Sequence, residues 1–401
     1  MSKKNSETAV NQRFLKSPIL KTLLRFKMSD VPLEIIRLIL RQLPVKPLLR
    51  FRCVSKPWRS LIDDEDFIKL HLHHSAKTNS NRTLLVNSTK LFYLDLDTFV
   101  LLDTGNLRFK HRRVAGACNG LVLLVSDSND VVLWNPSTRK LNELPTSFEG
   151  NCREGRYVFG YDSKHDDYKV LRVAKGCDWV DGGCMCSEAT IYSLKTNSWK
   201  EVEDFPYMLD DSKTWGVYLN DALHTGIEND DGSGAVIMAF DLAKEEHYMV
   251  PAPEVSGLTS VEVMGGCLAA VVFLKKKNSC EIWVMKEYMV KGSWSKLFCF
   301  DPPIAEPCVN LCPLAYSKTG DDVLLNNEGI CLNWYNLRNK TLTIACVDGL
   351  SASFGATALD PLLDAWVCVE SLVSPNSPSQ VGIAKQNGGD DFLSVGFKLV
   401  L

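Results

Sequence analysis

A pattern of strand, turn and strand recurs through most of the chain after residue 90. In each copy an apolar run ends in a large side chain, a short turn follows, and a second run begins a few residues later. The large residues lie 40, 58, 48, 43 and 52 positions apart, which is typical of the four-stranded blades of a β-propeller. Six copies predict six blades. The anchoring residues are Leu94, Trp134, Tyr192, Phe240, Trp283 and Tyr335, and the second runs hold Leu141, Trp199, Tyr248, Trp294 and Leu342.

Other apolar runs between the anchors supply the remaining strands of each blade. Residues 118–124, 168–173, 217–227 and 267–274 are expected to form inner strands, because neighbouring blades cover both faces of such strands. An open ring leaves a sheet edge unpaired, so we expect residues 365–372 to return and complete the first blade. The same strand content is also compatible with an array of β-sandwiches.

Residues 30–74 have a different sequence pattern, in which short stretches of helical periodicity are separated by prolines. In the first stretch Ile35, Ile36 and Leu40 are expected on one face and Arg37 on the other. We expect the first helix to begin at Pro32 and end at Pro44, a second to open at Pro47, a third to follow Ser55 and Pro57, and a last helix to be capped by Asp66.

These helices carry more apolar side chains than a unit of this size can hide. A domain of about 45 residues buries too small a share of its surface to stand alone. Part of the apolar surface must therefore meet another protein or the body of the same chain. Periodicity leaves both alternatives open.

The same stretch resembles an F-box, from Val31-Pro32-Leu33-Glu34-Ile35-Ile36 through Leu43-Pro44-Val45-Lys46 to the run 48–62. Pro57 departs from the usual pattern, and it is compatible with a first helical turn. The resemblance implies docking on the Skp adaptor of an SCF (Skp, cullin, F-box) ubiquitin ligase. By position it assigns adaptor binding or the underlying core to Pro32, Leu33, Ile35, Ile36, Leu43, Pro44, Leu48, Leu49, Val54, Ser55 and Trp58.

The repeats resemble the plant F-box-associated (FBA) domain, which is kelch-like. The residues that carry this likeness are Cys118-Asn119-Gly120-Leu121, Leu133 to Arg139, Phe159-Gly160-Tyr161-Asp162 and Asp167-Tyr168-Lys169-Val170. The double glycine of true kelch blades occurs once in a suitable place, at Gly265-Gly266, so FBA fits better. The likeness is greatest to the CPR-type (defence-repressor) and S-locus branches. These branches imply protein targets, including immune receptors and self-incompatibility nucleases.

The domain plan that follows is a short helical F-box and an all-β propeller, α+β multidomain as a whole. Residues 1–27 hold seven Lys/Arg against Glu7 alone, and we expect a disordered or loosely helical extension rather than a transit peptide. The predicted boundaries are an extension at 1–27, an F-box at 28–75, a linker at 76–81, a propeller at 82–375 and a tail at 376–401.

Composition limits the compartment and the partners. Residues 1–75 carry a net charge of +8 and the remainder −11, for a total of −3, which argues against a bulk nucleic-acid binder. No apolar run approaches the length of a membrane span, so we expect a soluble protein of cytoplasm and nucleus.

The 14 cysteines are scattered and are expected to be reduced. Zinc-site spacing is absent from two groups of cysteines (Cys177, Cys184 and Cys186; Cys308 and Cys312) and from the histidines at 71, 73 and 74. We interpret these histidines as part of a polar helix end.

Catalytic motifs are absent from the sequence, and no cofactor is predicted. Asp166-Asp167 and the acidic stretch 230–234 are interpreted as turn residues. The predicted function is recognition of a target protein for ubiquitination and proteasomal degradation, with target contacts in connections 146–156, 175–188, 205–214, 227–234 and 301–312. The acidic balance of these connections favours a partner with a basic patch. The alternatives are a sugar-binding or hydrolase propeller with a helical cap, and adaptor binding without a cullin.

Overall fold

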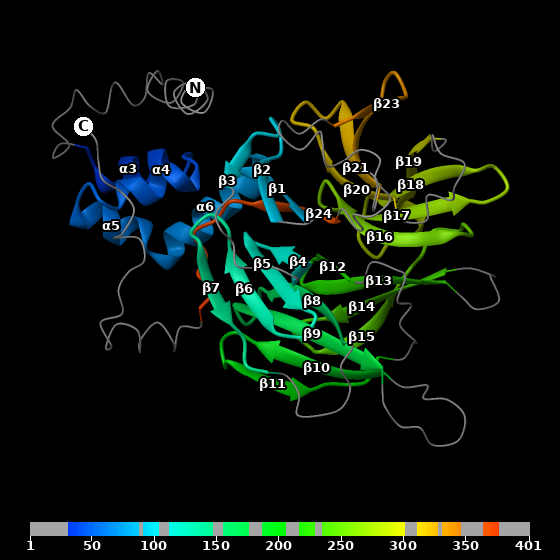
Figure 1. The fold of residues 1–401 in the computed structure, drawn as a ribbon, viewed down its shortest axis with the longest axis horizontal. Coiled ribbons are helices and arrows are strands. Elements are labelled where there is room, and N and C mark those ends of the chain that lie inside the picture. The colour runs from blue at the N-terminus through cyan, green and yellow to red at the C-terminus, as the bar shows by residue number, and fades with distance from the viewer. Residues whose placement is uncertain are drawn as a thin grey trace. The chain divides into compact units, whose positions relative to one another are not determined.

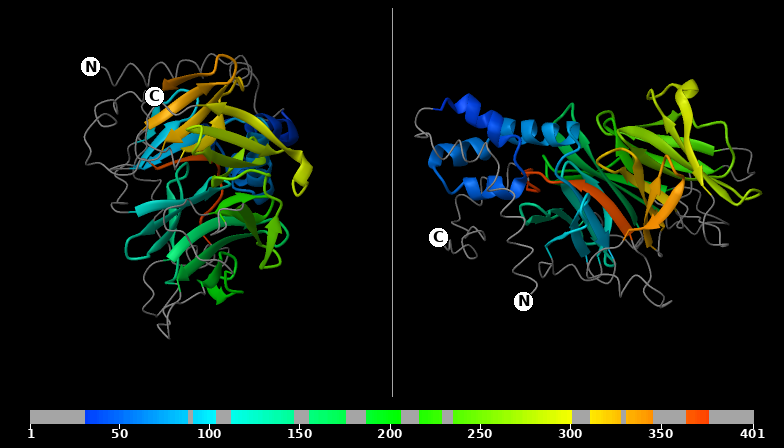
Figure 2. Two further views of the ribbon diagram at one scale, coloured as in Figure 1. Left: turned by 90° about the vertical axis from the view of Figure 1, so that its right-hand side faces the viewer. Right: turned by 90° about the horizontal axis from the view of Figure 1, so that it is seen from above.

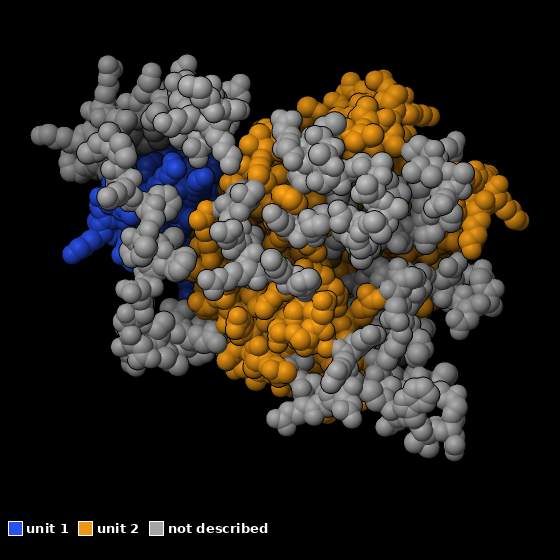
Figure 3. All heavy atoms as spheres, in the orientation of Figure 1, with its two compact units in different colours: residues 1–74 blue, residues 75–401 orange. Residues whose placement is uncertain are grey.

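The computed structural model describes residues 31–87, 91–103, 112–146, 155–175, 187–205, 216–228, 235–300, 311–327, 331–345 and 364–376. The chain divides into two compact units, residues 1–74 and residues 75–401, which Figure 3 colours separately. The predicted extension at 1–27 and almost all of the predicted tail lie outside the described residues. Within the described ranges, no helix has the length and apolar content needed to cross a bilayer.

The described residues of the N-terminal part of the chain form four short helices, drawn in blue in Figure 1, and the last of them runs on to Lys77. Ser55 begins the third by accepting a hydrogen bond from the Trp58 amide at 3.3 Å, with Pro57 in the first turn, as the sequence predicts. The helices are α3 (Leu33–Leu40), α4 (Val45–Phe51), α5 (Lys56–Ile62) and α6 (Glu65–Lys77).

Three predicted helix boundaries are wrong. Helix α3 ends at Leu40, four residues before the expected end at Pro44. Helix α4 begins after Pro44, two residues before the expected start at Pro47. Helix α6 is capped by Asp64, whose carboxylate accepts a hydrogen bond from the Phe67 amide at 3.0 Å, whereas Asp66 lies inside the first turn. Any residue of the acidic run 63–66 can serve as a cap, so the sequence alone does not choose between them.

The second unit contains six four-stranded antiparallel sheets around a common centre (Figures 1 and 2). This confirms the predicted six-bladed propeller. Blade 1 holds β24 (Asp364–Val369), β1 (Arg82–Asn87), β2 (Leu91–Asp95) and β3 (Leu101–Asp103). Blade 2 holds β4 (Arg112–Cys118), β5 (Leu121–Ser126), β6 (Val131–Asn135) and β7 (Lys140–Glu143). Blade 3 holds β8 (Gly155–Asp162), β9 (Asp167–Lys175), β10 (Ser187–Ser193) and β11 (Ser198–Glu201).

The second half of the ring repeats this plan, coloured green to orange in Figure 1. Blade 4 holds β12 (Val217–Leu219), β13 (Ala222–Glu228), β14 (Ala235–Asp241) and β15 (Glu246–Val250). Blade 5 holds β16 (Leu258–Met264), β17 (Cys267–Leu274), β18 (Ser279–Met285) and β19 (Trp294–Phe300), with a 3-10 turn η2 (Lys291–Ser293) before the last strand. Blade 6 holds β20 (Leu311–Tyr316), β21 (Asp322–Asn327), β22 (Cys331–Asn336) and β23 (Thr341–Ile344).

Ring closure follows from pairing and from packing. Strand β24 pairs with β1 in antiparallel register, so the C-terminal strand completes the first blade as predicted. Buried clusters join each blade to the next in cyclic order, including one that packs Leu84 and Leu94 of blade 1 against Leu324 of blade 6. Burial of apolar area between sheets is the main stabilising contribution in such a ring.

The predicted inner runs 118–124, 168–173 and 267–274 lie mainly on second strands, β5, β9 and β17, and the run 217–227 covers the innermost strand β12 as well as the second strand β13. Their burial is as expected, since five successive residues of β5 and six of β17 are buried. The innermost strands β4, β8, β12, β16, β20 and β24 contact one another around the ring, and β5 and β13 also contact strands of neighbouring blades.

Chain connectivity gives the propeller two unlike ends. Because neighbouring strands are antiparallel, the turns 119–120, 163–166, 220–221 and 265–266 all lie at one end, which we call the short-turn end. In each blade the first and third strands begin at the other end, and the second and fourth strands finish there; we call it the long-connection end.

The recurring tryptophans of the fourth strands share one role. The indole of Trp199 donates a hydrogen bond to the carbonyl of Pro145, and that of Trp294 donates to the carbonyl of Pro251, each at 2.8 Å. Each acceptor belongs to the link that leaves the preceding blade. The sequence repeat therefore marks a contact that fixes one blade to the next.

Candidate functional site

Helix α3 is apolar on two faces. Ile36 and Leu40 lie one turn apart and are buried, with exposed fractions of 6% and 1%. Ile35 and Leu38 lie on the opposite face and keep 46% and 45% of their surface exposed. The expectation that Ile35 shares a face with Ile36 and Leu40 is therefore wrong. Its face is open within the described chain.

A small core beneath this surface holds the helices together. It contains the buried side chains of Val45, Leu48, Ile62 and Phe67. The ring of Trp58 packs edge-on against Phe51, with 5.4 Å between ring centroids. This core fixes the position of the exposed residues of α3.

His71 belongs to the core, so its interpretation as part of a polar helix end is wrong. The side chain is buried, and its Nε2 lies 2.8 Å from the carbonyl oxygen of Leu43. Burial lowers the pKa of His71, because the charged ring would lose its hydration. A neutral His71 can donate a hydrogen bond to the Leu43 carbonyl, which ties α6 to the turn that follows α3.

The structure divides the eleven residues assigned by resemblance into three groups, which the sequence did not separate. Whether any of them contacts an adaptor stays a prediction. Pro32, Leu33, Ile35 and Val54 are exposed; Leu43, Pro44, Leu49 and Ser55 are half-buried; Ile36, Leu48 and Trp58 are buried.

Leu38 is an exposed apolar residue that the sequence analysis did not single out. It lies three residues after Ile35 on the same face of α3, and Leu33 and Val54 add exposed fractions of 50% and 52% elsewhere on the unit. The helical spacing of Ile35 and Leu38 was the available signal. We call Leu33, Ile35, Leu38 and Val54 the exposed apolar set.

The predicted target-binding connections fall largely outside the described residues. Of the five stretches, only flanking residues such as Gly155, Phe205 and Cys312 are described. The assignment of the five stretches as contact loops stays a prediction.

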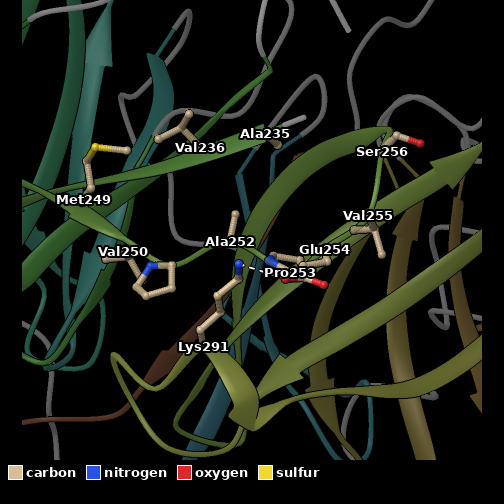
Figure 4. Close-up of a pocket in the computed structure, with 11 residues that line it drawn as sticks. Ala235, Val236, Met249, Val250, Ala252, Pro253, Glu254, Val255, Ser256 and Lys291 are labelled. Carbon is tan, nitrogen blue, oxygen red and sulfur yellow. Dashed lines mark ion pairs between the residues drawn. The ribbon is translucent and has the colours of Figure 1, made fainter. Parts of the chain in front are cut away.

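An open hollow of about 670 Å³ lies between parts of blades 4 and 5 (Figure 4). Its lining is mostly apolar and includes Met249, Pro251 and Pro253. Its charged groups are Lys291 and Glu254, whose Nζ and carboxylate lie 2.9 Å apart in an ion pair. These two charged side chains form an ion pair with each other and are exposed to solvent. Among the residues that line the hollow, no other side chain could act as a general acid or base.

Other candidate chemical groups are structural in the described part of the chain. No cluster of three or more His, Cys, Asp or Glu side chains that could hold a metal occurs there. Cys118, Cys280 and Cys368 are buried free thiols, as expected, while Cys177, Cys184, Cys186 and Cys308 lie outside the described residues. Asp166 occupies a left-handed turn position, in agreement with its interpretation as a turn residue. Asp167 is instead buried as the first residue of β9, so its interpretation as a turn residue is wrong.

Comparison with known proteins agrees with this architecture. Residues 28–70 match the F-box domain, and residues 85–374 match the F-box associated beta propeller domain. The Arabidopsis thaliana proteins F-box protein CPR1 and F-box protein At4g22390 are 32% and 30% identical to the chain. Each alignment covers 93% of this chain and 100% of the relative.

Solved structures show a more distant likeness. An oligogalacturonate lyase in complex with manganese is 14% identical, with a TM-score of 0.39 over 67% of this chain and 73% of the lyase. The helical unit with its exposed apolar set, the six-bladed ring and the two domain matches together give one assignment. The chain belongs to the family of F-box proteins that carry an F-box associated β-propeller domain.

Proposed function

We propose that this protein is the substrate-recognition subunit of an SCF-type ubiquitin ligase. In this proposal the helical unit docks on a Skp-family adaptor, and through it a cullin, while the propeller binds a target protein for ubiquitination and degradation. The observation that carries the proposal is the outward face of α3, where Ile35 and Leu38 remain exposed opposite the helix's own core. Apolar side chains in such a position favour burial against a partner.

The mechanism is positional. Holding a target near the ligase's conjugating enzyme raises the effective concentration of its lysines around the reactive thioester. The chain itself transfers nothing in this scheme, so we propose a non-catalytic adaptor. We further propose that it acts in cytoplasm and nucleus. Because the repeats resemble the CPR-type (defence-repressor) branch, we propose a role in defence as well.

The test uses exposed residues, because truncating a buried one such as Leu48 would unfold the unit. We expect Ile35→Asp and Leu38→Asp to weaken binding to a purified Skp adaptor by about tenfold or more, since interface centres tolerate a charge poorly. Val100→Asp is the matched control, because Val100 is 48% exposed but lies in the propeller. Calorimetric titration measures binding, and circular dichroism measures folding of each variant.

Two outcomes count against the proposal. Undiminished adaptor binding by the α3 variants would remove the docking role, and cooperative melting of the whole protein by these surface changes would favour the helical-cap alternative. Target recognition is tested separately by proximity labelling in cells. Targets are expected to accumulate on a bait that lacks residues 30–74 but retains the propeller.

A further inference from the structure

Three consecutive lysines form the turn between β17 and β18, which we call the lysine turn. Lys275, Lys276 and Lys277 follow the last residue of β17, and all three side chains are exposed. Within the described chain, no ion pair or hydrogen bond engages any of their ammonium groups. Three charges of one sign on adjacent residues repel one another until a counter-charge is bound. The turn therefore presents available positive charge to a partner.

Glu281, on β18, is an acidic residue whose charge is coupled to this turn. Burial alone would raise the pKa of Glu281, but hydrogen bonds from Lys296 and Trp283 and the charges of Lys296 and Lys277 lower it. The side chain is buried, and its carboxylate lies 2.7 Å from the Nζ of Lys296. Residues 251–300 as a whole hold six lysines against four glutamates. Since Glu281 is already held by Lys296, the lysine turn keeps a net positive charge.

The lysine turn lies beside the hollow of Figure 4. The Gly257 carbonyl accepts a hydrogen bond from the Phe273 amide at 2.8 Å, which extends the antiparallel pairing of β16 with β17. Residues 255–256 precede Gly257 and line the hollow, and residues 274–275 follow Phe273. Because the strands are antiparallel, both stretches continue in the same direction beyond this bond, at the long-connection end. A side chain from each stretch also packs against one buried cluster.

The hollow is suited to apolar side chains. Its volume of about 670 Å³ lies within the range of roughly 300–1,000 Å³ that is usual for binding pockets. Met249 lines it and keeps 60% of its surface exposed (Figure 4). The charged groups of the lining, Glu254 and Lys291, are paired with each other. An apolar side chain of a partner would remove the Met249 side chain from water, and a flexible thioether adapts to different shapes.

We infer that the hollow and the lysine turn together bind an extended acidic segment of the target protein, with an apolar side chain in the hollow and carboxylates on the turn. Charge-assisted hydrogen bonds from ammonium groups to carboxylates supply the polar contacts. The apolar lining and the negative net charge of the chain favour such a segment over a nucleic acid. This inference rests on the proposed function, because it names the class of segment that the propeller of a substrate receptor recognises.

Strand geometry limits the spacing within the segment. The hollow and the lysine turn meet at neighbouring residues of two paired strands, and an extended chain advances about 3.3 Å per residue. We therefore expect the carboxylates within about five residues of the apolar side chain. The site lies outside the five stretches predicted to contact a target. The expectation of a basic partner, which was drawn from the acidic balance of those stretches, does not apply to it.

Fluorescence polarisation of the full-length protein with degenerate peptide pools tests the inference. All pools share random flanking positions, and the fixed centre is two leucines joined to three glutamates, in either order. In one reference pool glutamine replaces glutamate, and in the other serine replaces leucine. We expect one order of the leucine–glutamate pool to bind at least about tenfold more tightly than either of its reference pools.

Two variants separate the two parts of the site. Changing all three residues of the lysine turn to glutamine should abolish the preference for glutamate over glutamine, because the counter-charge is gone. Met249→Ser should reduce the preference for leucine over serine by about fivefold or more, because an apolar contact in the hollow is lost. Raising the salt concentration should weaken binding of the leucine–glutamate pool more than that of the leucine–glutamine pool.

Matched controls exist for both variants. The triple change Lys140→Gln, Lys318→Gln and Lys340→Gln removes the same charge from exposed lysines elsewhere in the propeller. Ile344→Ser removes an apolar side chain that is 70% exposed on the fourth strand of blade 6. Both controls should keep both preferences.

Equal binding of all pools, or preferences that the lysine-turn and Met249 variants keep, would overturn the inference. Tighter binding of a fluorescent single-stranded RNA through the same lysines would also overturn it, because the turn would then be a nucleic-acid contact. Should Met249→Ser fail to fold, Met249→Gln keeps the length of the side chain and carries the same expectation. Adaptor binding by all these variants is expected to be normal, so failure here is distinguishable from failure of the docking proposal.

Discussion

The side-chain amide of Asn135 donates a hydrogen bond to the main-chain carbonyl of Ser371 at 3.0 Å, across 236 positions of sequence. The same amide donates to the carbonyl of Val373 at 2.7 Å, and its oxygen accepts from the amide of Ser137 at 2.9 Å. One buried side chain thus fixes both the turn after β6 and the segment after β24. We call residues 371–376 the C-terminal strap, because Asn142 also donates to the carbonyl of Pro375 within it.

Replacing Asn135 with Ala should destabilise the ring by about 2–3 kcal/mol, since it removes the hydrogen bonds to the carbonyls of Ser371 and Val373 as well as those that cap the turn after β6, and leaves the strap carbonyls unpaired. Asn336→Ala is the matched control. Its oxygen caps the equivalent turn in blade 6 through the Asn339 amide at 2.8 Å, but its amide donates to Asp322 rather than to the strap. Urea unfolding compares the two. Equal losses would mean that the strap adds nothing to closure.

Gly120→Ala should destabilise the protein by at least about 2 kcal/mol more than Gly266→Ala, in which only backbone strain is added. Both glycines have a φ near +80°, at +80° and +79°. A Cβ on Gly120 would press on Ser371 and lie 2.6 Å from the carbonyl oxygen of Val369, whereas one on Gly266 would meet nothing within 4 Å.

Hydrogen exchange locates the effect of the Gly120 change. Faster exchange at the amides of residues 371–376 is expected in Gly120→Ala and not in Gly266→Ala. Equal unfolding free energies for the two variants would show that the strap shifts without cost.

The blades were predictable because each one repeats a local signal. An apolar run that ends in Trp134 or Tyr192, followed by a polar turn and Leu141 or Trp199, encodes a hairpin from neighbouring residues alone. The number of blades and the closing strand then follow from spacing and from the need to pair an edge.

The strap and the outward face of α3 were not predictable for physical reasons. Asn135 and Ser371 are joined by a polar contact between distant positions, which leaves no periodic trace. In α3, eight residues make two turns, and Ile35 and Ile36 are adjacent apolar residues on different faces. Periodicity in so short a helix does not show which apolar face is buried by its own unit.

Lys169→Met should destabilise the propeller by about 3 kcal/mol, because it leaves the buried carboxylate of Asp162 without its lysine, whereas Glu245 keeps its pair with Lys200. The Nζ of Lys169 lies 2.9 Å from Asp162 and 3.0 Å from Glu245, and it donates to the carbonyl of Leu242 at 2.6 Å. Lys200→Met is the control: Lys200 also pairs with Glu245 but is 61% exposed, so a change below about 1 kcal/mol is expected.

The loss in Lys169→Met should shrink in acid. Burial alone would raise the pKa of Asp162, but hydrogen bonds from Lys169 and His165 outweigh burial and lower it. The stabilisation is therefore complete above the ordinary carboxyl range, about pH 4, and is lost as pH falls through the lowered pKa. Guanidinium unfolding of both proteins at neutral and acid pH measures this. A constant difference across pH would contradict a charge-based role.

His224→Gln should flatten the loss of stability between about pH 6.5 and pH 4. The buried imidazole has its Nε2 2.6 Å from the Tyr288 hydroxyl, which lies 2.6 Å from the Tyr248 hydroxyl. Burial lowers the pKa of His224 to about 4. Below about pH 6.5 the unfolded chain takes up a proton at this histidine, whereas the folded chain stays neutral there. The free energy of unfolding therefore decreases as pH is lowered, by at most about 3 kcal/mol at pH 4. Glutamine cannot take up that proton and can still bond to Tyr288.

Melting temperatures of the wild-type protein and His224→Gln, recorded from pH 7.5 to pH 4, check this expectation. His71 and His247 also have lowered pKa values because of burial, but both are present in each protein and cancel in the difference. His165→Gln serves as the control, since His165 is half-exposed and bonded to Asp162. The His224 difference should grow steadily below about pH 6.5 because each further unit of pH protonates more of the unfolded chain. Parallel curves for wild type and variant would show that the folded ring accommodates a charged imidazole between blades 4 and 5.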